Sequence, residues 1–252
     1  MKFIKTLSIT CLFITIIACQ PKKQPQITNT PKNIKKGEEI VNKAIAAHGG
    51  DLYKTASYSF DFRGKEYSFT HKGDEFKYTL KNKEILDVLE NGNFSRYQQG
   101  QLIELSPKKR NSYSAALNSV LYFSLLPYKL NDAAVHKTYI DTITIKNKKY
   151  HTVKVTFDEN GGGEDHQDIF YYWINNQTNT VEYIAYKYEV NGGGIRFRSA
   201  YNTRNVDGIL FQDYINYKAP FETKMTELPS LYETEQLKEV SRINITNITA
   251  IR

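Results

Sequence analysis

Cysteine is nearly absent from this sequence, which limits how a folded domain can be stabilised. Of 252 residues only two are cysteines, Cys11 and Cys19, and both lie close to the N-terminus. The chain after residue 19 therefore forms no internal disulfide, so its stability has to come from a hydrophobic core. A cysteine nucleophile and a thiolate metal site are excluded there for the same reason.

Short catalytic motifs are missing as well. The sequence contains neither G-x-S-x-G nor H-E-x-x-H. The acid–base candidates that remain are His48, His166 and Asp168, and a histidine at the end of a predicted helix is more often a capping or core residue. The acidic residues of 158–168 lack metal-ligand spacing, which favours a solvated turn. We predict no catalytic residue, metal or cofactor, and keep a hydrolase or lyase with an anionic substrate as an alternative.

Long hydrophobic runs are absent except for one near the N-terminus. The run from Ile9 to Ala18 follows Lys2 and Lys5 and is too short to span a bilayer as a stable helix. This arrangement is typical of a signal peptide. Ile16 to Cys19 resemble the lipobox of bacterial lipoproteins, which implies cleavage before the cysteine and attachment of acyl chains such as palmitate to it.

The predicted domain organisation follows from this signal. Residues 1–18 are the signal peptide, residues 19–36 are the lipidated cysteine and a flexible tether rich in Pro, Lys, Gln and Asn, and residues 37–252 form one domain. Gln20 rather than an aspartate follows the cysteine, which by resemblance to lipoprotein sorting rules implies the outer membrane. We expect an outer membrane lipoprotein that faces the periplasm and is held by its lipid anchor.

Acidic residues are too few to balance the basic ones, and the formal net charge is +7. A nucleic-acid-binding domain would carry a basic stripe interleaved with aromatic residues on its folded part. Here much of the positive charge lies in the signal peptide and the tether, next to the expected membrane surface. We therefore expect no nucleic-acid partner, and a monomer.

Asp168 to Lys218 is the stretch with the strongest pattern. It holds four runs of aromatic and β-branched residues separated by Asn, Gly and Asp clusters, which predicts an antiparallel meander. Both faces of the second run carry apolar side chains, so further layers have to cover both faces of this sheet. The four predicted strands are Ile169–Ile174, Val181–Val190, Ile195–Thr203 and Ile209–Tyr217.

Two amphipathic helices are predicted to supply those layers. One covers Lys36–His48 and ends at Gly49-Gly50, and the other covers Asn111–Leu125 after the Ser106-Pro107 start signal. A short helix is expected near 131–136, and residues 220–238 form either a loop or a short helix.

Further alternating runs bring the total to about eleven strands, with hairpin turns at Asn91-Gly92 and Gln99-Gly100 and a closing strand within Val240–Ile251. So wide a sheet has to coil. The predicted fold class is α+β, mainly β: a single strongly curved antiparallel sheet, a half-barrel, with helices packed on its concave face.

This combination of lipobox, tether, amphipathic helix and long antiparallel strands resembles the LolA/LolB/LppX lipoprotein-carrier superfamily. The turn from Tyr172-Trp173-Ile174-Asn175 into Thr178 and Thr180 looks like a strand-turn-strand of that group. Residues 36–218 also resemble a family of bacterial lipoproteins that has no assigned activity. The matching pieces are His48-Gly49-Gly50, Phe60 to Arg63, Asn118-Ser119-Val120, Leu126-Pro127, Leu130-Asn131-Asp132 and Arg196 to Asn202.

The carrier resemblance implies an apolar cavity between sheet and helix that binds acyl chains. Arg196 and Arg198 share one face of a predicted strand, and Arg63 or Arg204 could join them to hold a carboxylate or phosphate; the alternative is that they are exposed surface cations. We expect a non-enzymatic protein that binds a lipid or other amphiphile, with an envelope interaction module as a further alternative. The aromatic candidates to line the cavity are Tyr58, Phe60, Phe62, Tyr122, Phe123 and Tyr186.

Overall fold

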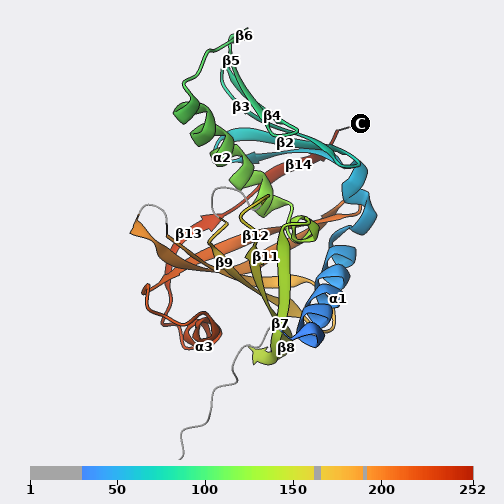
Figure 1. Ribbon diagram of the computed structural model, residues 1–252, viewed down its shortest axis with the longest axis vertical. Helices are drawn as coiled ribbons and strands as arrows, with labels where there is room; N and C mark the ends of the chain where they lie inside the picture. The colour runs from blue at the N-terminus through green and yellow to red at the C-terminus, as the bar shows by residue number, and fades with distance from the viewer. Residues whose placement is uncertain (1–29, 162–165, 190–191, 252) are drawn as a thin grey trace, which may run out of the picture.

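Two antiparallel sheets, each of seven strands, make up most of the protein (Figure 1). The computed structural model describes residues 30–161, 166–189 and 192–251. In spatial order, sheet A consists of β14 (Thr246–Ala250), β1 (Ser57–Phe62), β2 (Lys65–Lys72), β3 (Glu75–Asn82), β4 (Ile85–Glu90), β5 (Asn93–Gln98) and β6 (Gln101–Leu102). Sheet B consists of β13 (Lys238–Ile243), β12 (Ile209–Ala219), β11 (Gly194–Val206), β10 (Val181–Tyr188), β9 (Ile169–Asn175), β8 (Lys148–Phe157) and β7 (Val135–Ile145).

The mainly β, antiparallel class is confirmed, but the prediction of a single sheet of about eleven strands is wrong. Helix α2 (Pro107–Ser124) separates the strands along the chain, so β1 to β6 pair in one sheet and β7 to β13 in the other. The predicted closing strand is in fact two strands. The chain passes from β13 in sheet B to β14 in sheet A at Asn244 and Ile245, which returns the C-terminal strand to the side of β1.

Tight turns fix the register of the hairpins. At Asn91-Gly92 the φ angles are 47° and 83°, and at Gln99-Gly100 they are 50° and 79°. Positive φ at both central positions is what a type I′ turn requires, and this turn matches the twist of the paired strands. Both predicted hairpins are confirmed, as β4–β5 and β5–β6.

Sheet B is covered on both faces, as its apolar pattern requires. On one face, α1 (Pro31–His48) buries Val41 and Ala44 against the sheet. On the other face, Trp173 and Phe197 pack with Leu228 of the short helix α3 (Leu228–Glu233). The layer on this second face therefore comes from residues 220–238, which were predicted to form either a loop or a short helix. It does not come from either of the two longer helices.

Sheet A packs against α2, which runs between the two sheets in Figure 1. Leu117, Leu121 and Leu125 recur every four residues and lie in one core with Phe60 and Phe69. Ile209 and Phe211 of β12 belong to the same core, which ties sheet B to sheet A.

The first helix is longer than expected. Thr30 is its N-cap, accepting a hydrogen bond at Oγ1 from the Asn33 N–H, and Pro31 stands at its start. Residues 31–36 are therefore helical rather than part of the predicted tether. The prediction of a short helix near 131–136 is wrong, because a 3₁₀ turn occupies Tyr128–Asn131 and β7 begins at Val135.

Candidate ligand-binding cleft between the sheets

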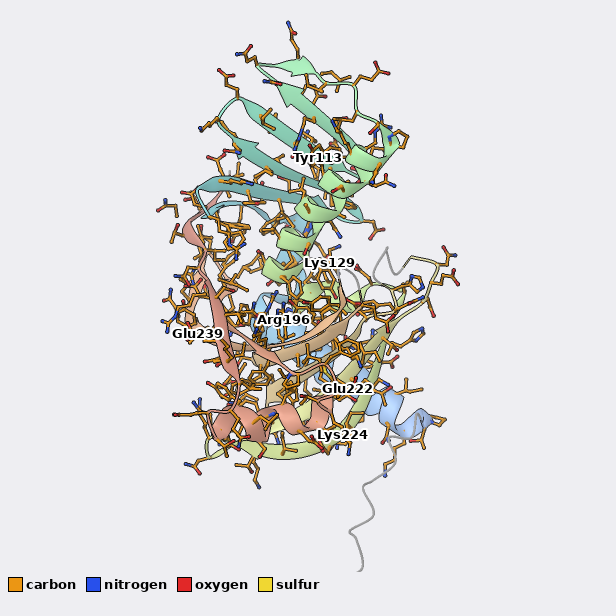
Figure 2. The ribbon with its side chains drawn as sticks, turned by 90° about the vertical axis from the view of Figure 1, so that its left-hand side faces the viewer. Tyr113, Lys129, Arg196, Glu222, Lys224 and Glu239 are labelled. Atoms are coloured by element: carbon orange, nitrogen blue, oxygen red, sulfur yellow. The ribbon has the colours of Figure 1, made fainter. Side chains whose placement is uncertain are left out.

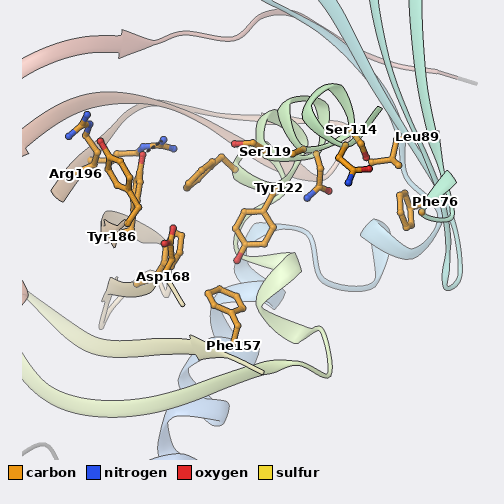
Figure 3. A pocket seen from close by; sticks show the side chains of 17 residues that line it. Phe76, Leu89, Ser114, Ser119, Tyr122, Phe157, Asp168, Tyr186 and Arg196 are labelled. Atoms are coloured by element: carbon orange, nitrogen blue, oxygen red, sulfur yellow. Dashed lines mark hydrogen bonds between the residues drawn. The ribbon is translucent and has the colours of Figure 1, made fainter. Parts of the chain in front are cut away.

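A cleft of about 750 Å³ lies between the β3–β5 end of sheet A and the β8–β11 part of sheet B, with α2 along one side (Figure 3). This volume lies in the range of small-molecule sites. Phe76 and Leu89 lie at one end of the cleft in Figure 3, Arg196 lies at the other, and Tyr122 lies between them. The cleft thus has large apolar side chains at one end, beside Ser114 of α2, and a cationic side chain at the other.

The wall contributed by α2 is polar. Asn111, Ser114, Asn118 and Tyr122 line the cleft, and their spacing of three or four residues places them on one side of the helix. The leucines of α2 occupy another side and pack against sheet A. The helical spacing of these polar residues was visible in the sequence and could have indicated that they share one face. A polar face of a helix is ordinarily interpreted as exposed to solvent, so the spacing alone did not indicate a cleft.

The wall contributed by sheet B is aromatic. The rings of Phe170 and Tyr186 stack with centroids 5.2 Å apart, and Phe157 packs against Phe170 at 5.7 Å. Phe123 of α2 extends this surface, 5.5 Å from the Tyr186 ring. Stacked aromatic rings offer a flat apolar surface, and the tyrosine adds a hydroxyl at its edge.

Arg198 is buried at the side of this wall, with 7% of its surface exposed. Its guanidinium lies 3.8 Å from the centroid of the Phe123 ring, and Nη2 donates to the Tyr186 hydroxyl at 2.9 Å. Its Nε has no hydrogen-bond partner, and no carboxylate of the described chain forms an ion pair with it. A buried cation without a counter-charge costs stability.

Arg196 lies two residues earlier on β11, so the two side chains share a face of the strand. It lines the same cleft, with its guanidinium 5.2 Å from the Tyr188 ring centroid and Nη1 donating to the Ile195 carbonyl at 3.1 Å. Figure 2 shows Arg196 midway along the molecule, below Tyr113 of α2 and above Lys224.

A second, smaller cavity of about 230 Å³ adjoins the cleft. The two share Ser119, Phe123 and Arg198, so Arg198 faces both. Phe62 and Arg63 belong to the lining of the smaller cavity.

Two tyrosines, Tyr122 in the cleft lining and Tyr172 of β9, carry buried hydroxyls near the cleft. Burial raises the pKa of Tyr122 and of Tyr172, so both stay neutral. The two hydroxyls lie near each other, but neither makes a hydrogen bond of ordinary geometry in the described chain. Together with Arg198 Nε they leave unused donors in the interior, which native cores seldom do.

The family model of a family of unknown function (DUF6503) matches residues 28–246. The chain belongs to this family. A search of curated protein sequences returns no match.

Several solved structures have a fold similar to that of this chain. A LolA superfamily protein from Nitrosomonas europaea is 11% identical, with 86% of this chain and 94% of that chain covered and a TM-score of 0.50. A DUF1329 family protein from Desulfovibrio piger is 8% identical, with 86% and 93% covered and a TM-score of 0.52. The lipoprotein LppX of Mycobacterium tuberculosis is 9% identical over 63% of this chain and 90% of its own, with a TM-score of 0.29 too low to support any comparison of detail. The expected resemblance to the LolA superfamily is confirmed for the fold.

The predicted ligand-binding residues fall into three places: the cleft, the smaller cavity and the core of sheet A. Tyr122, Phe123, Tyr186, Arg196 and Arg198 line the cleft, and Phe62 and Arg63 line the smaller cavity.

Tyr58 and Phe60 line neither space, because both are buried in the core of sheet A. The Tyr58 hydroxyl donates to the Val206 carbonyl at 3.1 Å. Arg204 does not join the other arginines, since its Nη2 lies 3.1 Å from Oδ1 of Asp213. Sequence reasoning missed Phe157, Phe170 and Tyr188 as cleft residues; Phe170 and Tyr188 lie inside the predicted strands, where alternation alone does not say which apolar face borders a cavity.

The acid–base candidates are not brought together as a site. His48 is buried at the end of α1, where Nε2 accepts the Val181 N–H at 3.1 Å, and it does not line the cleft. His166 is half-buried and also absent from the lining, whereas Asp168 lines the cleft.

The predicted lipid anchor at Cys19 lies outside the described residues, which begin at residue 30. Among residues 30–161, 166–189 and 192–251, no helix is both long and apolar enough to cross a membrane. No group of three or more His, Cys, Asp or Glu side chains in these ranges is placed to hold a metal ion.

Proposed function

We propose that this protein is a lipoprotein anchored to the outer membrane through Cys19, facing the periplasm, which binds a lipid or other amphiphile without catalysing a reaction. The observation that carries the proposal is the cleft between the sheets, with Phe76 and Leu89 at one end and Arg196 at the other. An amphiphile has the same division between an apolar chain and a polar head. The LolA-like fold of the DUF6503 chain supports the proposal, because the LolA superfamily includes lipoprotein carriers.

Two alanines of α2 allow a matched test of binding in the cleft. Ala115 lines the cleft, whereas its neighbour Ala116 is exposed and lines neither cavity. Residues 20–252 contain every described helix, strand and core, so this chain is used with the neutral probe N-phenyl-1-naphthylamine, whose fluorescence rises on entering an apolar site. Ala115→Trp fills the cleft and is expected to weaken binding by roughly tenfold, while Ala116→Trp leaves it unchanged.

Equal affinity of the two tryptophan variants for the probe would show that the probe does not bind in the cleft. If the wild-type chain binds neither the probe nor any long-chain competitor, the proposal that it binds an amphiphile is wrong.

The two cysteines provide a matched test of the anchor. In cells given labelled palmitate, Cys19→Ser is expected to lose both the label and its place in the outer membrane fraction. Cys11→Ser is the control, because Cys11 lies within the predicted signal peptide and is removed with it. Label retained by Cys19→Ser would contradict the predicted lipidation site.

A further inference from the structure

Arg198 differs from Arg96 and Arg204, two other arginines that the fold partly buries. Arg96 donates to both carboxylate oxygens of Asp87, at 2.6 Å and 2.7 Å, and Arg204 pairs with Asp213. The chain thus supplies a carboxylate to each of these guanidinium groups. Arg198 is more deeply buried than either, yet its contacts are aromatic rings and one hydroxyl. A structural role alone does not account for a buried cation without its counter-ion.

The surroundings of Arg198 are neutral or positive. The described groups near it include the rings of Phe123 and Tyr186 and the hydroxyls of Tyr172 and Tyr214, and on the side of the smaller cavity Gln212, Asn216 and Ser241, all uncharged. Arg196 adds a second cation on the same strand face, and Lys218 stands opposite Arg196 on β12. Among the described residues that line the cleft, Asp168 is the one carboxylate. The cleft therefore has an excess of positive charge at this end, which favours an anion.

The unused donor atoms point to the same conclusion. Arg198 Nε is buried and unpartnered in the described chain, and the hydroxyl of Tyr122, which lines the cleft, has only the nearby Tyr172 hydroxyl beside it. A carboxylate or phosphate offers several acceptor oxygens, and a guanidinium binds such groups through two parallel hydrogen bonds. Arg198 and Phe123 also border the smaller cavity.

We infer that the ligand is a single-chain anionic amphiphile, whose carboxylate or phosphate head is bound by Arg198 with Arg196 while its chain lies along the aromatic wall toward Phe76 and Leu89. This inference rests on the proposed amphiphile binding and adds the class of head group. The cleft volume of about 750 Å³ suits one chain, since it falls within the range of single small-molecule sites.

The test compares ligands that differ only in the head group. Dodecanoate, dodecyl phosphate and neutral 1-dodecanol compete with N-phenyl-1-naphthylamine for residues 20–252, at a pH where both acids are ionised. The wild-type chain is expected to bind at least one of the anions roughly tenfold more tightly than dodecanol. Whichever anion binds more tightly identifies a carboxylate or a phosphate as the preferred head.

Arg198→Met keeps an unbranched side chain as far as the position of Nε and removes the charged guanidinium group. It is expected to lower the affinity for the preferred anion to that for dodecanol, and to leave the affinity for dodecanol unchanged. Arg242→Met is the charge-matched control, because Arg242 is exposed on β13 and pairs with Glu239. Should Arg198→Met fail to fold, Arg198→Lys takes its place: it loses the two-pronged donor, so its preference for the anion is expected to fall by roughly threefold or more.

Equal wild-type affinity for the anions and dodecanol would overturn the anionic head group but leave amphiphile binding in place. A preference for anions that survives in Arg198→Met, or that is undiminished in Arg198→Lys where that variant stands in, would overturn the role of Arg198. Failure of all three ligands to displace the probe would instead count against the proposed function itself.

Discussion

His48 is buried at the C-terminal end of α1, with 1% of its surface exposed. Burial lowers the pKa of His48 from 6.5 to about 4, and contact with the Leu210 backbone opposes this shift only in part. Its Nε2 accepts the Val181 N–H, so the neutral ring links the helix to β10 of sheet B. The histidine considered as an acid–base candidate thus acts as a structural link, and its charge state is coupled to folding.

The pH dependence of stability tests this role. The folded chain keeps His48 neutral, whereas the unfolded chain takes up a proton below about pH 6.5, so the free energy of unfolding is expected to fall by ~3 kcal/mol between pH 6.5 and about 4. His71, whose pKa burial also lowers, adds to the fall. In urea unfolding at several pH values, His48→Gln should show a clearly shallower slope in this window. Identical slopes for wild type and variant would contradict the assignment.

Single residues were predictable where strand alternation was the deciding pattern. Arg196 and Arg198 were expected on one face of a strand, and both line the cleft. Tyr58 and Phe60 were grouped with them because they are aromatic and alternate in the same way, yet they lie in the sheet A core. Alternation separates the two faces of a strand, but whether a face meets a helix or a cavity depends on tertiary packing.

Gly37 allows α1 to lie directly on β7. A Cβ at Gly37 would lie 2.7 Å from the Lys137 carbonyl oxygen and 2.9 Å from the Tyr139 backbone nitrogen. In an exposed helix, Gly→Ala would stabilise by up to about 1 kcal/mol. Gly37→Ala is instead expected to lower the free energy of unfolding by about 2 kcal/mol, because backbone atoms cannot move aside.

Chemical denaturation measures this change, and Glu38→Ala, on the exposed side of the same helix, serves as the control and should stay within about 0.5 kcal/mol of wild type. A Gly37→Ala chain more stable than wild type would show that α1 does not pack so closely.

Asp213 joins the segments that connect the two sheets. Its Oδ1 accepts the Ile245 N–H at 3.0 Å and lies 3.1 Å from Arg204 Nη2, and its Oδ2 accepts from Asn202 at 2.7 Å. The side chain is 4% exposed. Asp213→Asn leaves Arg204 without its counter-charge at the point where the chain passes from β13 to β14.

The expected loss of unfolding free energy for Asp213→Asn is about 3 kcal/mol, measured by urea titration. Glu239→Gln removes the acid of an exposed ion pair and should cost less than about 1 kcal/mol. Comparable losses in the two variants would mean that Asp213 contributes no more than a surface acid.

At the scale of the whole molecule, the sequence predicted strands, hairpins and two long helices, but not how many sheets they form. Strand pairing across α2 is not encoded in local alternation, so a long run of antiparallel strands was taken as one sheet. The sequence also does not indicate that the chain passes from sheet B to sheet A at Asn244 and Ile245, because the residues on both sides of this point form one run rich in β-branched side chains. The cleft depends on the division of the strands into two sheets, because it lies between them. One continuous sheet would not form such a cleft.

Photolabelling tests most directly whether an amphiphile occupies this cleft. The chain of residues 20–252 is irradiated with a dodecanoate that carries a diazirine on its alkyl chain, and the labelled peptides are identified by mass spectrometry. Label is expected on peptides of α2 and of β8 to β10, with excess unlabelled dodecanoate suppressing it. Label confined to the outer face of sheet A, around Thr79 and Val88 where another hollow lies, or label that unlabelled dodecanoate does not suppress, would contradict the account.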